Sequence, residues 1–139
     1  MQVERIEFNS ILYAMIFSNT SSNEGINFIT DPDALLQLGV MSHPAGHEII
    51  PHVHKPFRRV TDGTQEVMYI KEGKMLVEFY DYEQRYLSNY ELNGGDWLIL
   101  FEGGHGFKII EDTTFIEVKN GPYVADEDKI RFYNSGDVV

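Results

Sequence analysis

The feature that most constrains this chain is a series of short apolar segments, each bounded by turn residues, with no long amphipathic helix pattern between them. Residues 11–17 have the length and side chains of a β-strand, and a polar loop follows them. Residues 31–33 resemble a helix start, but the apolar residues soon alternate, so we expect only about one helical turn there. This pattern is typical of an all-β sandwich or barrel.

The turn signals are clearest in the second half of the chain. Glu72-Gly73-Lys74 predicts a tight hairpin turn between strands at residues 67–70 and 75–80. Further turns are predicted at clusters of Gly, Asn, Asp or Glu, namely residues 81–84, 93–96, 102–104 and 111–112. Hairpins in series predict an all-β antiparallel barrel or jelly roll with little helix.

Length and composition narrow the class of protein. The 139 residues fit one domain, which we divide into an N-terminal strand arm over about 1–30, a barrel over about 35–120 and a C-terminal tail over about 121–139. The chain has no cysteine, which excludes disulfides, thiolate zinc sites and a cysteine nucleophile.

Charge and hydropathy indicate the kind of partner. The net charge is −11, from 22 acidic and 11 basic residues, and such a surface repels nucleic acid and anionic membranes. The N-terminus does not resemble a secretory signal, and the longest apolar run, residues 11–17, is shorter than the ~20 residues of a membrane-spanning helix. We therefore expect a cytoplasmic protein whose partner is a small molecule.

The histidines are concentrated in one region. The chain has five, and four of them lie within residues 43–54. His52 and His54 are two residues apart, so in a strand both imidazoles point to the same face. His43 and His47 lack such a pairing, and we interpret them as surface or rim residues outside the metal set.

Two further polar residues, Glu66 and His105, are predicted to lie on the same strand face as apolar neighbours. Glu66 has the parity of Met68 in its predicted strand, and His105 has the parity of Phe107, so both are predicted to face the barrel interior. A carboxylate there is costly unless it is paired or binds a metal. The resulting metal set contains His52, His54, Glu66 and His105, and these nitrogen and oxygen ligands suit one divalent ion: Fe, Mn, Ni, Co or Zn.

The spacing of these residues resembles that of the cupin family. Gly46 and the later His52-Val53-His54 resemble the first half of the first cupin motif, and Glu66 followed by Gly73 resembles its second half. Residues 95–105, which end at His105, resemble the second motif. The resemblance covers residues 46–105 and implies a small single-domain cupin.

The chain departs from the cupin pattern in two places. Eleven residues, 55–65, separate His54 from Glu66, where the family has three or four, which predicts a longer loop at the mouth of the barrel. In the second motif, Phe101 replaces the usual proline, the spacing before the histidine is one residue shorter, and Ile109 replaces the later asparagine.

Three functions are compatible with such a site. The first is a metal-dependent enzyme, of the isomerase or dioxygenase type, on a small carbohydrate-like or anionic metabolite. The second is a sugar- or metabolite-binding protein without turnover, and the third is a metal-free, epimerase-like barrel in which a histidine transfers a proton. No catalytic residue is assigned from the sequence.

The loop between the ligands contains the candidate substrate-binding residues. Lys55, Arg58 and Arg59 are placed to bind a carboxylate or phosphate if the loop folds over the barrel mouth. The alternative, which we favour slightly, is a solvated basic loop. Small cupins commonly pair, so the resemblance implies a homodimer. The apolar strand at residues 11–17 is the candidate for its interface, because an uncovered edge strand invites pairing.

Overall fold

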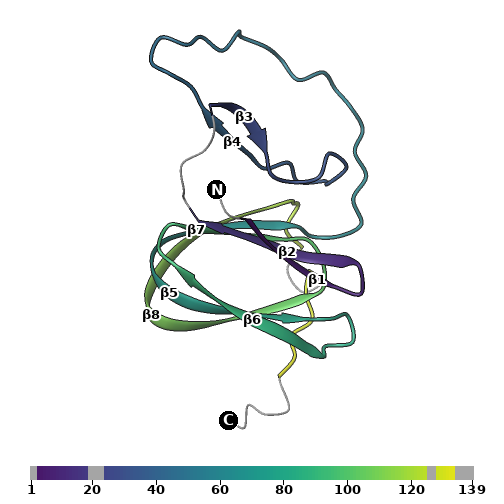
Figure 1. Ribbon diagram of the computed structural model, residues 1–139. Helices are drawn as coiled ribbons and strands as arrows, with labels where there is room; N and C mark the ends of the chain where they lie inside the picture. The colour runs from purple at the N-terminus through teal and green to yellow at the C-terminus, as the bar shows by residue number, and fades with distance from the viewer. Residues whose placement is uncertain (1–2, 19–23, 125–127, 134–139) are drawn as a thin grey trace.

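A computed structural model describes residues 3–18, 24–124 and 128–133. These residues form strands and irregular segments without helix, which confirms the predicted all-β class (Figure 1). The eight strands, in chain order, are β1 (Val3–Phe8), β2 (Ile11–Ser18), β3 (Gly25–Phe28), β4 (Gly39–Ser42), β5 (Glu66–Tyr80), β6 (Tyr86–Asn93), β7 (Asp96–Leu100) and β8 (Gly104–Lys119). Accordingly, the described residues include no helix that could span a membrane.

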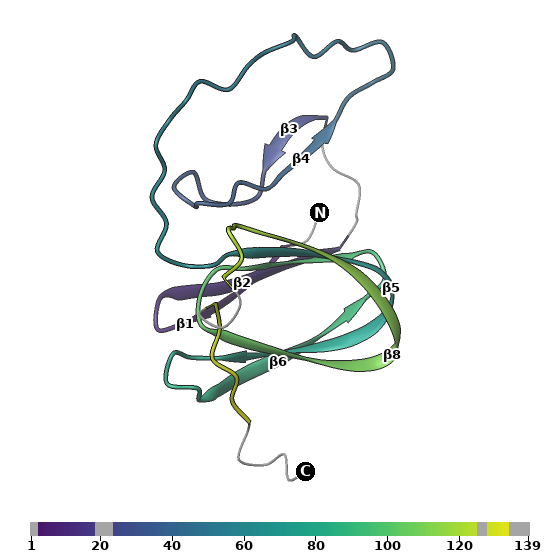
Figure 2. The ribbon, with the colours of Figure 1, turned by 180° about the vertical axis from the view of Figure 1, so that it is seen from behind.

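Six strands form one antiparallel sheet with the order β1-β2-β7-β5-β6, in which β8 also pairs with β5. The two longest strands, β5 and β8, run side by side over most of their length and curl together, so the sheet wraps around an interior (Figures 1 and 2). This is a curled antiparallel sheet of the barrel or jelly-roll type, and it is called the barrel below. The strand β2 lies between β1 and β7, so the idea that residues 11–17 form an uncovered edge is wrong.

The hairpin predicted at Gly73 is also wrong. The chain continues through this glycine as one strand, β5, and the pairing register with β8 shifts on both sides of it. Gly73 adopts a φ of 92°, which lets the strand bend at a bulge instead of reversing. In the same way, β8 continues through residues 111–112, where a turn was predicted.

The other predicted turns are present. Residues 81–84 connect β5 to β6, with the Asp81 amide donating to the Arg85 carbonyl, and residues 94–95 connect β6 to β7. Gly103 precedes β8 with a φ of 71°, and a Cβ there would lie 2.5 Å from the Tyr80 carbonyl oxygen. This close approach explains why a glycine occupies the turn before His105.

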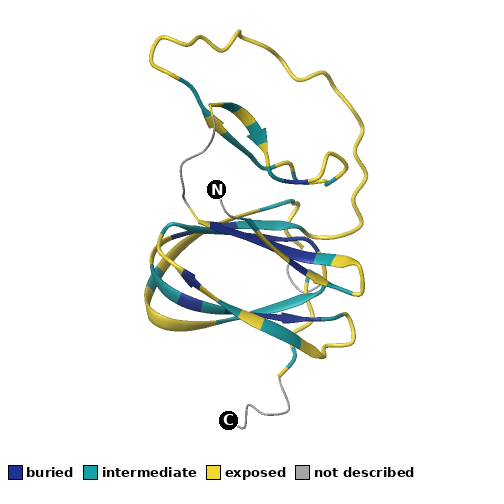
Figure 3. Ribbon diagram, viewed as in Figure 1, coloured by how far each residue is buried: buried dark blue, intermediate teal, exposed yellow. Residues whose placement is uncertain are grey.

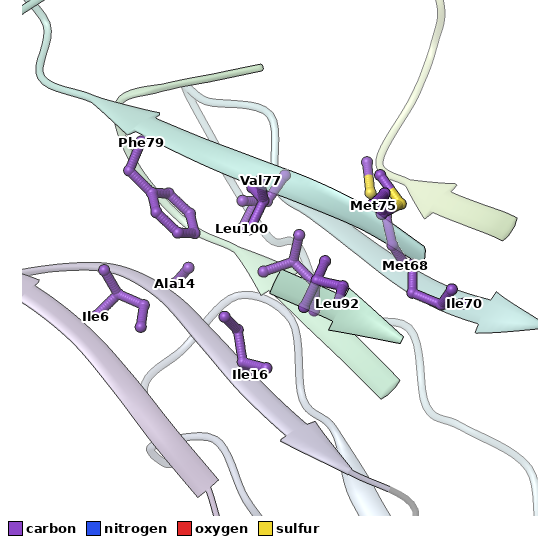
Figure 4. Packing of buried hydrophobic residues seen from close by; sticks show 11 residues of the cluster. Ile6, Ala14, Ile16, Met68, Ile70, Met75, Val77, Phe79, Leu92 and Leu100 are labelled. Carbon is purple, nitrogen blue, oxygen red and sulfur yellow. The ribbon is translucent and has the colours of Figure 1, made fainter. Parts of the chain in front are cut away.

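The larger hydrophobic core fills the interior of the barrel (Figure 4). It contains Ile6, Ala14, Ile16, Met68, Ile70, Met75, Val77, Phe79, Leu92, Leu98 and Leu100. A second cluster, formed by Met15, Phe17, Ile99 and Phe101, lies on the other side of β2 and β7. Residues 29–38 cover this second cluster through Ile29, Ala34 and Leu38, which attaches the β3–β4 hairpin to the barrel.

Residues 43–65 form a long irregular segment beyond the barrel (Figure 1). Almost all of its side chains are exposed, in contrast to β2, β5 and β7, which contain most of the buried residues of the barrel (Figure 3). The strand predicted through His52 and His54 is therefore not formed. Pro51 and Pro56 lie on either side of the histidine pair, and each lacks the N–H that a strand ladder uses.

Candidate functional site

The site is built on the ends of the two longest strands. Glu66 is the first residue of β5 and His105 is the second residue of β8, and in the antiparallel β5–β8 ladder they lie at opposite ends, where Glu66 pairs with Lys119 and His105 with Phe79. The curl of the sheet brings these two ends together (Figures 1 and 2). Their side chains meet there, with His105 Nε2 3.3 Å from Glu66 Oε2. The Glu66 side chain is 12% exposed and that of His105 is 30% exposed, so the pair is partly shielded from water but still accessible.

The carboxylate of Glu66 is held in its charged form. Its pKa is lowered, first by the contact with His105 and further by the charges of Lys119 and Lys129, while burial acts in the opposite direction. The contact with His105 is close enough for this effect, but Oε2 is buried without a well-directed hydrogen bond. A buried carboxylate oxygen in this condition has capacity to bind a further cation or donor.

A cavity of about 1,110 Å³ opens beside this pair. Basic side chains reach it from β8 and from the segment that follows, namely Lys108, Lys119, Lys129 and Arg131. Aromatic side chains line it as well, namely Tyr80, Tyr82, Phe107, Phe132 and Tyr133. The acidic residues in the lining are Asp62, Glu66, Glu78, Asp81, Glu102 and Asp128. The cavity is larger than a typical small-molecule pocket of ~300–1,000 Å³ and combines charges of both signs with aromatic surface.

The C-terminal segment, residues 128–133, forms one wall of this cavity. Lys119 Nζ contacts Asp128 Oδ2 at 3.0 Å, and the ring of Phe132 packs edge-on against Tyr80 at 5.1 Å. The Phe132 ring also lies next to Gly104, where a Cβ would be 3.3 Å from it. The predicted tail, residues 121–139, is therefore packed on the barrel over these six residues, and its positions 125–127 and 134–139 lie outside the described residues.

The sequence analysis missed one buried charged group near the cavity. Glu78 is only 9% exposed; its carboxylate accepts a hydrogen bond from the Tyr80 hydroxyl at 3.0 Å and contacts Lys108 Nζ at 2.9 Å. The signal in the sequence is a carboxylate within the otherwise apolar run at residues 75–80. Two buried or nearly buried carboxylates, Glu66 and Glu78, thus line this part of the barrel.

The structure places the other predicted ligands elsewhere. His52 and His54 lie in the exposed segment, where their rings are 5.3 Å apart in an edge-on arrangement and His52 Nδ1 is 3.1 Å from the Ile50 carbonyl oxygen. Among residues 3–18, 24–124 and 128–133, no group of three or more His, Asp or Glu side chains is arranged to hold a metal ion. The predicted ligands therefore stand as two pairs, Glu66 with His105 and His52 with His54.

The predicted substrate-binding residues lie in the same exposed segment. Lys55, Arg58 and Arg59 are exposed, and the Arg59 guanidinium lies 5.3 Å from the centre of the Phe57 ring. None of the three lines the cavity. His43 and His47, which we excluded from the metal set, stack on each other with ring centres 4.2 Å apart.

The exposed segment is attached to the barrel next to the site. The Asn120 side chain, directly after β8, accepts a hydrogen bond from the Gln65 amide at 2.8 Å and donates one to the Gly63 carbonyl at 3.0 Å. The part of the segment from Gly63 onward is therefore fixed at the barrel mouth.

Comparisons of the chain with models of protein families, with curated proteins and with solved structures found no match.

Proposed function

We propose that this protein is a metal-dependent enzyme of the cupin type that acts on a small carbohydrate-like or anionic metabolite at the barrel mouth. Glu66 and His105 would hold one divalent ion there, together with His52 and His54 from the exposed segment. The observation that carries the proposal is the contact between His105 Nε2 and the buried Glu66 Oε2, which has no directed hydrogen bond.

The chemistry of these groups fits a metal ion. Imidazole nitrogens and a carboxylate form a set without soft ligands, which suits Fe, Mn, Ni, Co or Zn. The lowered pKa of Glu66 keeps its carboxylate charged at neutral pH, as metal binding requires. A bound ion would supply Lewis-acid polarisation of a substrate oxygen.

The proposal requires the exposed segment to fold onto the mouth. Eleven residues lie between His54 and Glu66, and an extended chain of that length spans up to ~40 Å. Within the described residues β8 pairs only with β5, so its other edge can accept a further strand. Ile50, His52 and His54 share one face in an extended conformation, and prolines are tolerated in an edge strand.

The substrate class follows from the charges at the cavity. Six acidic and four basic residues line it, and Lys119 and Lys108 are already paired with Asp128 and Glu78, so the lining carries no excess of positive charge. A hydroxyl-rich molecule of small size suits such a cavity, because the charged side chains supply both hydrogen-bond donors and acceptors. If the exposed segment folds over the mouth, Lys55, Arg58 and Arg59 would join them.

A second function is favoured by the same contact. A histidine next to a buried carboxylate is also the arrangement of a general base whose imidazole is oriented by an acid. In that metal-free function, His105 would transfer a proton and Glu66 would be its positioning residue. Chelation would then leave turnover intact, whereas His105→Ala would abolish it.

Metal content tests the proposal directly. Protein purified without an affinity tag is analysed for metals and titrated with Mn²⁺, Ni²⁺ and Zn²⁺ by calorimetry, for the wild type, Glu66→Gln, His54→Ala and the control His47→Ala. We expect about one equivalent of bound metal in the wild type and in the control His47→Ala. Glu66→Gln and His54→Ala each remove a ligand, so their metal affinity should fall by more than the ~10–100-fold that follows loss of an outer-shell partner. A wild-type content below about a tenth of an equivalent, with no uptake on titration, would leave only the metal-free function.

A further inference from the structure

The β3–β4 hairpin is a separate two-stranded sheet on the outside of the barrel (Figure 1). One of its faces is apolar and exposed: Ile26 is 59% exposed, Phe28 is 59% exposed and Met41 is 54% exposed. Ile26 pairs with Met41, and Phe28 pairs with Gly39, which lacks a side chain and leaves room for the Phe28 ring. These residues therefore make one continuous apolar face across both strands.

The hairpin lacks the features that protect free sheet edges. Neither β3 nor β4 contains a charged residue or a proline, and within the described residues each pairs only with the other. The other edges do carry charges, such as Glu4 and Arg5 in β1, Glu91 in β6, and Lys108 and Glu111 in β8. Charged residues on an edge disfavour pairing with the same edge of another copy, because like charges then face each other, so β3–β4 is the sheet of this chain best suited to pairing between copies.

Charge also favours this region as the place where two copies meet. Residues 25–65 contain four acidic and three basic residues, a net charge of −1, so the rest of the chain carries −10. Two barrels of that charge repel each other, whereas the hairpins approach with little repulsion. The hairpin is also held in place by Ile29, Ala34 and Leu38, which pack on the barrel, so little order is lost on association.

We propose that a second copy of this chain docks on the hairpin, with β3 of one copy pairing antiparallel with β3 of the other about a two-fold axis at Asn27. Ile26 of each copy then lies opposite Phe28 of its partner on the exposed face, so the strand is complementary to itself. The result is a four-stranded sheet across two copies, which meets the minimum of about three strands for a stable isolated sheet. The contact is isologous and closes as a dimer.

The oligomeric state tests this surface. Light scattering after size exclusion at micromolar concentration should give twice the chain mass for the wild type and the chain mass for Phe28→Glu. The matched control is Ile110→Glu, because Ile110 on β8 is 55% exposed but lies outside the hairpin; it should stay dimeric. Circular dichroism and the unfolding midpoint establish that Phe28→Glu is folded. A monomeric wild type, or a dimer that survives in Phe28→Glu, overturns the proposal.

A single cysteine then tests the strand that pairs, since the native chain has none. Under oxidation Asn27→Cys should give a covalent dimer, because residues directly opposite in an antiparallel pair are close enough for a disulfide. Ser42→Cys on β4 should stay monomeric on a non-reducing gel. Cross-linking of Ser42→Cys without Asn27→Cys would contradict pairing through β3. The dimer does not depend on the metal, so its failure would leave the proposed function untouched.

Discussion

The bulge at Gly73 is the feature of the fold that the sequence motif least suggested, and substitution by alanine tests it. A Cβ at this position would lie 2.1 Å from the Asp112 carbonyl oxygen and 2.6 Å from Thr113 Cα. Both atoms belong to the backbone of β8, so a side-chain rotation cannot relieve the overlap. Gly73 also has a φ of 92°, which L side chains rarely adopt.

The expected cost has two contributions. The positive φ costs roughly 1–2 kcal/mol for a residue with a Cβ. Moving β8 away from the added methyl group costs a further ~1–3 kcal/mol, by analogy with overpacked cores. Gly73→Ala should therefore lower the free energy of unfolding by about 2–5 kcal/mol.

Two other glycines separate these contributions. Gly95 has a φ of 98° but nothing within 4 Å of an added Cβ, so Gly95→Ala should show only the ~1–2 kcal/mol of the backbone conformation. Gly63 has neither feature, and Gly63→Ala should change stability by less than ~1 kcal/mol. Urea unfolding followed by circular dichroism measures all three. If Gly73→Ala is no more destabilised than Gly95→Ala, then β5 does not bend against β8 as described.

Two further predictions concern the barrel mouth. The pKa of Glu66 is lowered in the folded protein, so its ionised carboxylate stabilises the fold at pH values above the ordinary pKa of 4.5. This stabilisation is lost as the pH falls through the lowered pKa. The unfolding midpoint of Glu66→Gln should therefore fall less steeply in acid than that of the wild type, and equal slopes would contradict the shift. Phe132 holds residues 128–133 against Tyr80, so Phe132→Ala should speed tryptic cleavage after Lys129 and Arg131. Mass spectrometry follows the cleavage, and an unchanged rate would show that other contacts hold the segment.

Sequence reasoning predicted the strand class and most turns because these depend on local chemistry. The turns at residues 81–84, 93–96 and 102–104 contain Gly, Asn or Asp that close them without help from the rest of the fold. Gly73 was misinterpreted because a glycine with positive φ serves a hairpin turn and a bulge equally well. Only the pairing of β5 with β8 on both sides of it distinguishes the two.

The site was harder to predict for a related reason. Parity places Glu66 and His105 toward the interior, and the two side chains do meet. They meet because the curled β5–β8 ladder brings its two ends together, and this curl is a property of the whole sheet. His52 and His54 have the alternation of a strand, yet the strand needs a partner edge, and Pro51 weakens its ladder. Glu78 was missed because its apolar neighbours suggested an ordinary core strand, and its partners Tyr80 and Lys108 become clear only in three dimensions.

The most direct test of the metal site counts the imidazoles that bind. Nitrogen-15 NMR of uniformly labelled protein resolves the side chains of all five histidines, with assignments from single His→Gln variants. On addition of one equivalent of Zn²⁺, the account predicts that His52, His54 and His105 shift together while His43 and His47 do not. Shifts confined to His105, or shifts of His43 and His47 instead, would contradict a site that joins the exposed segment to the barrel mouth.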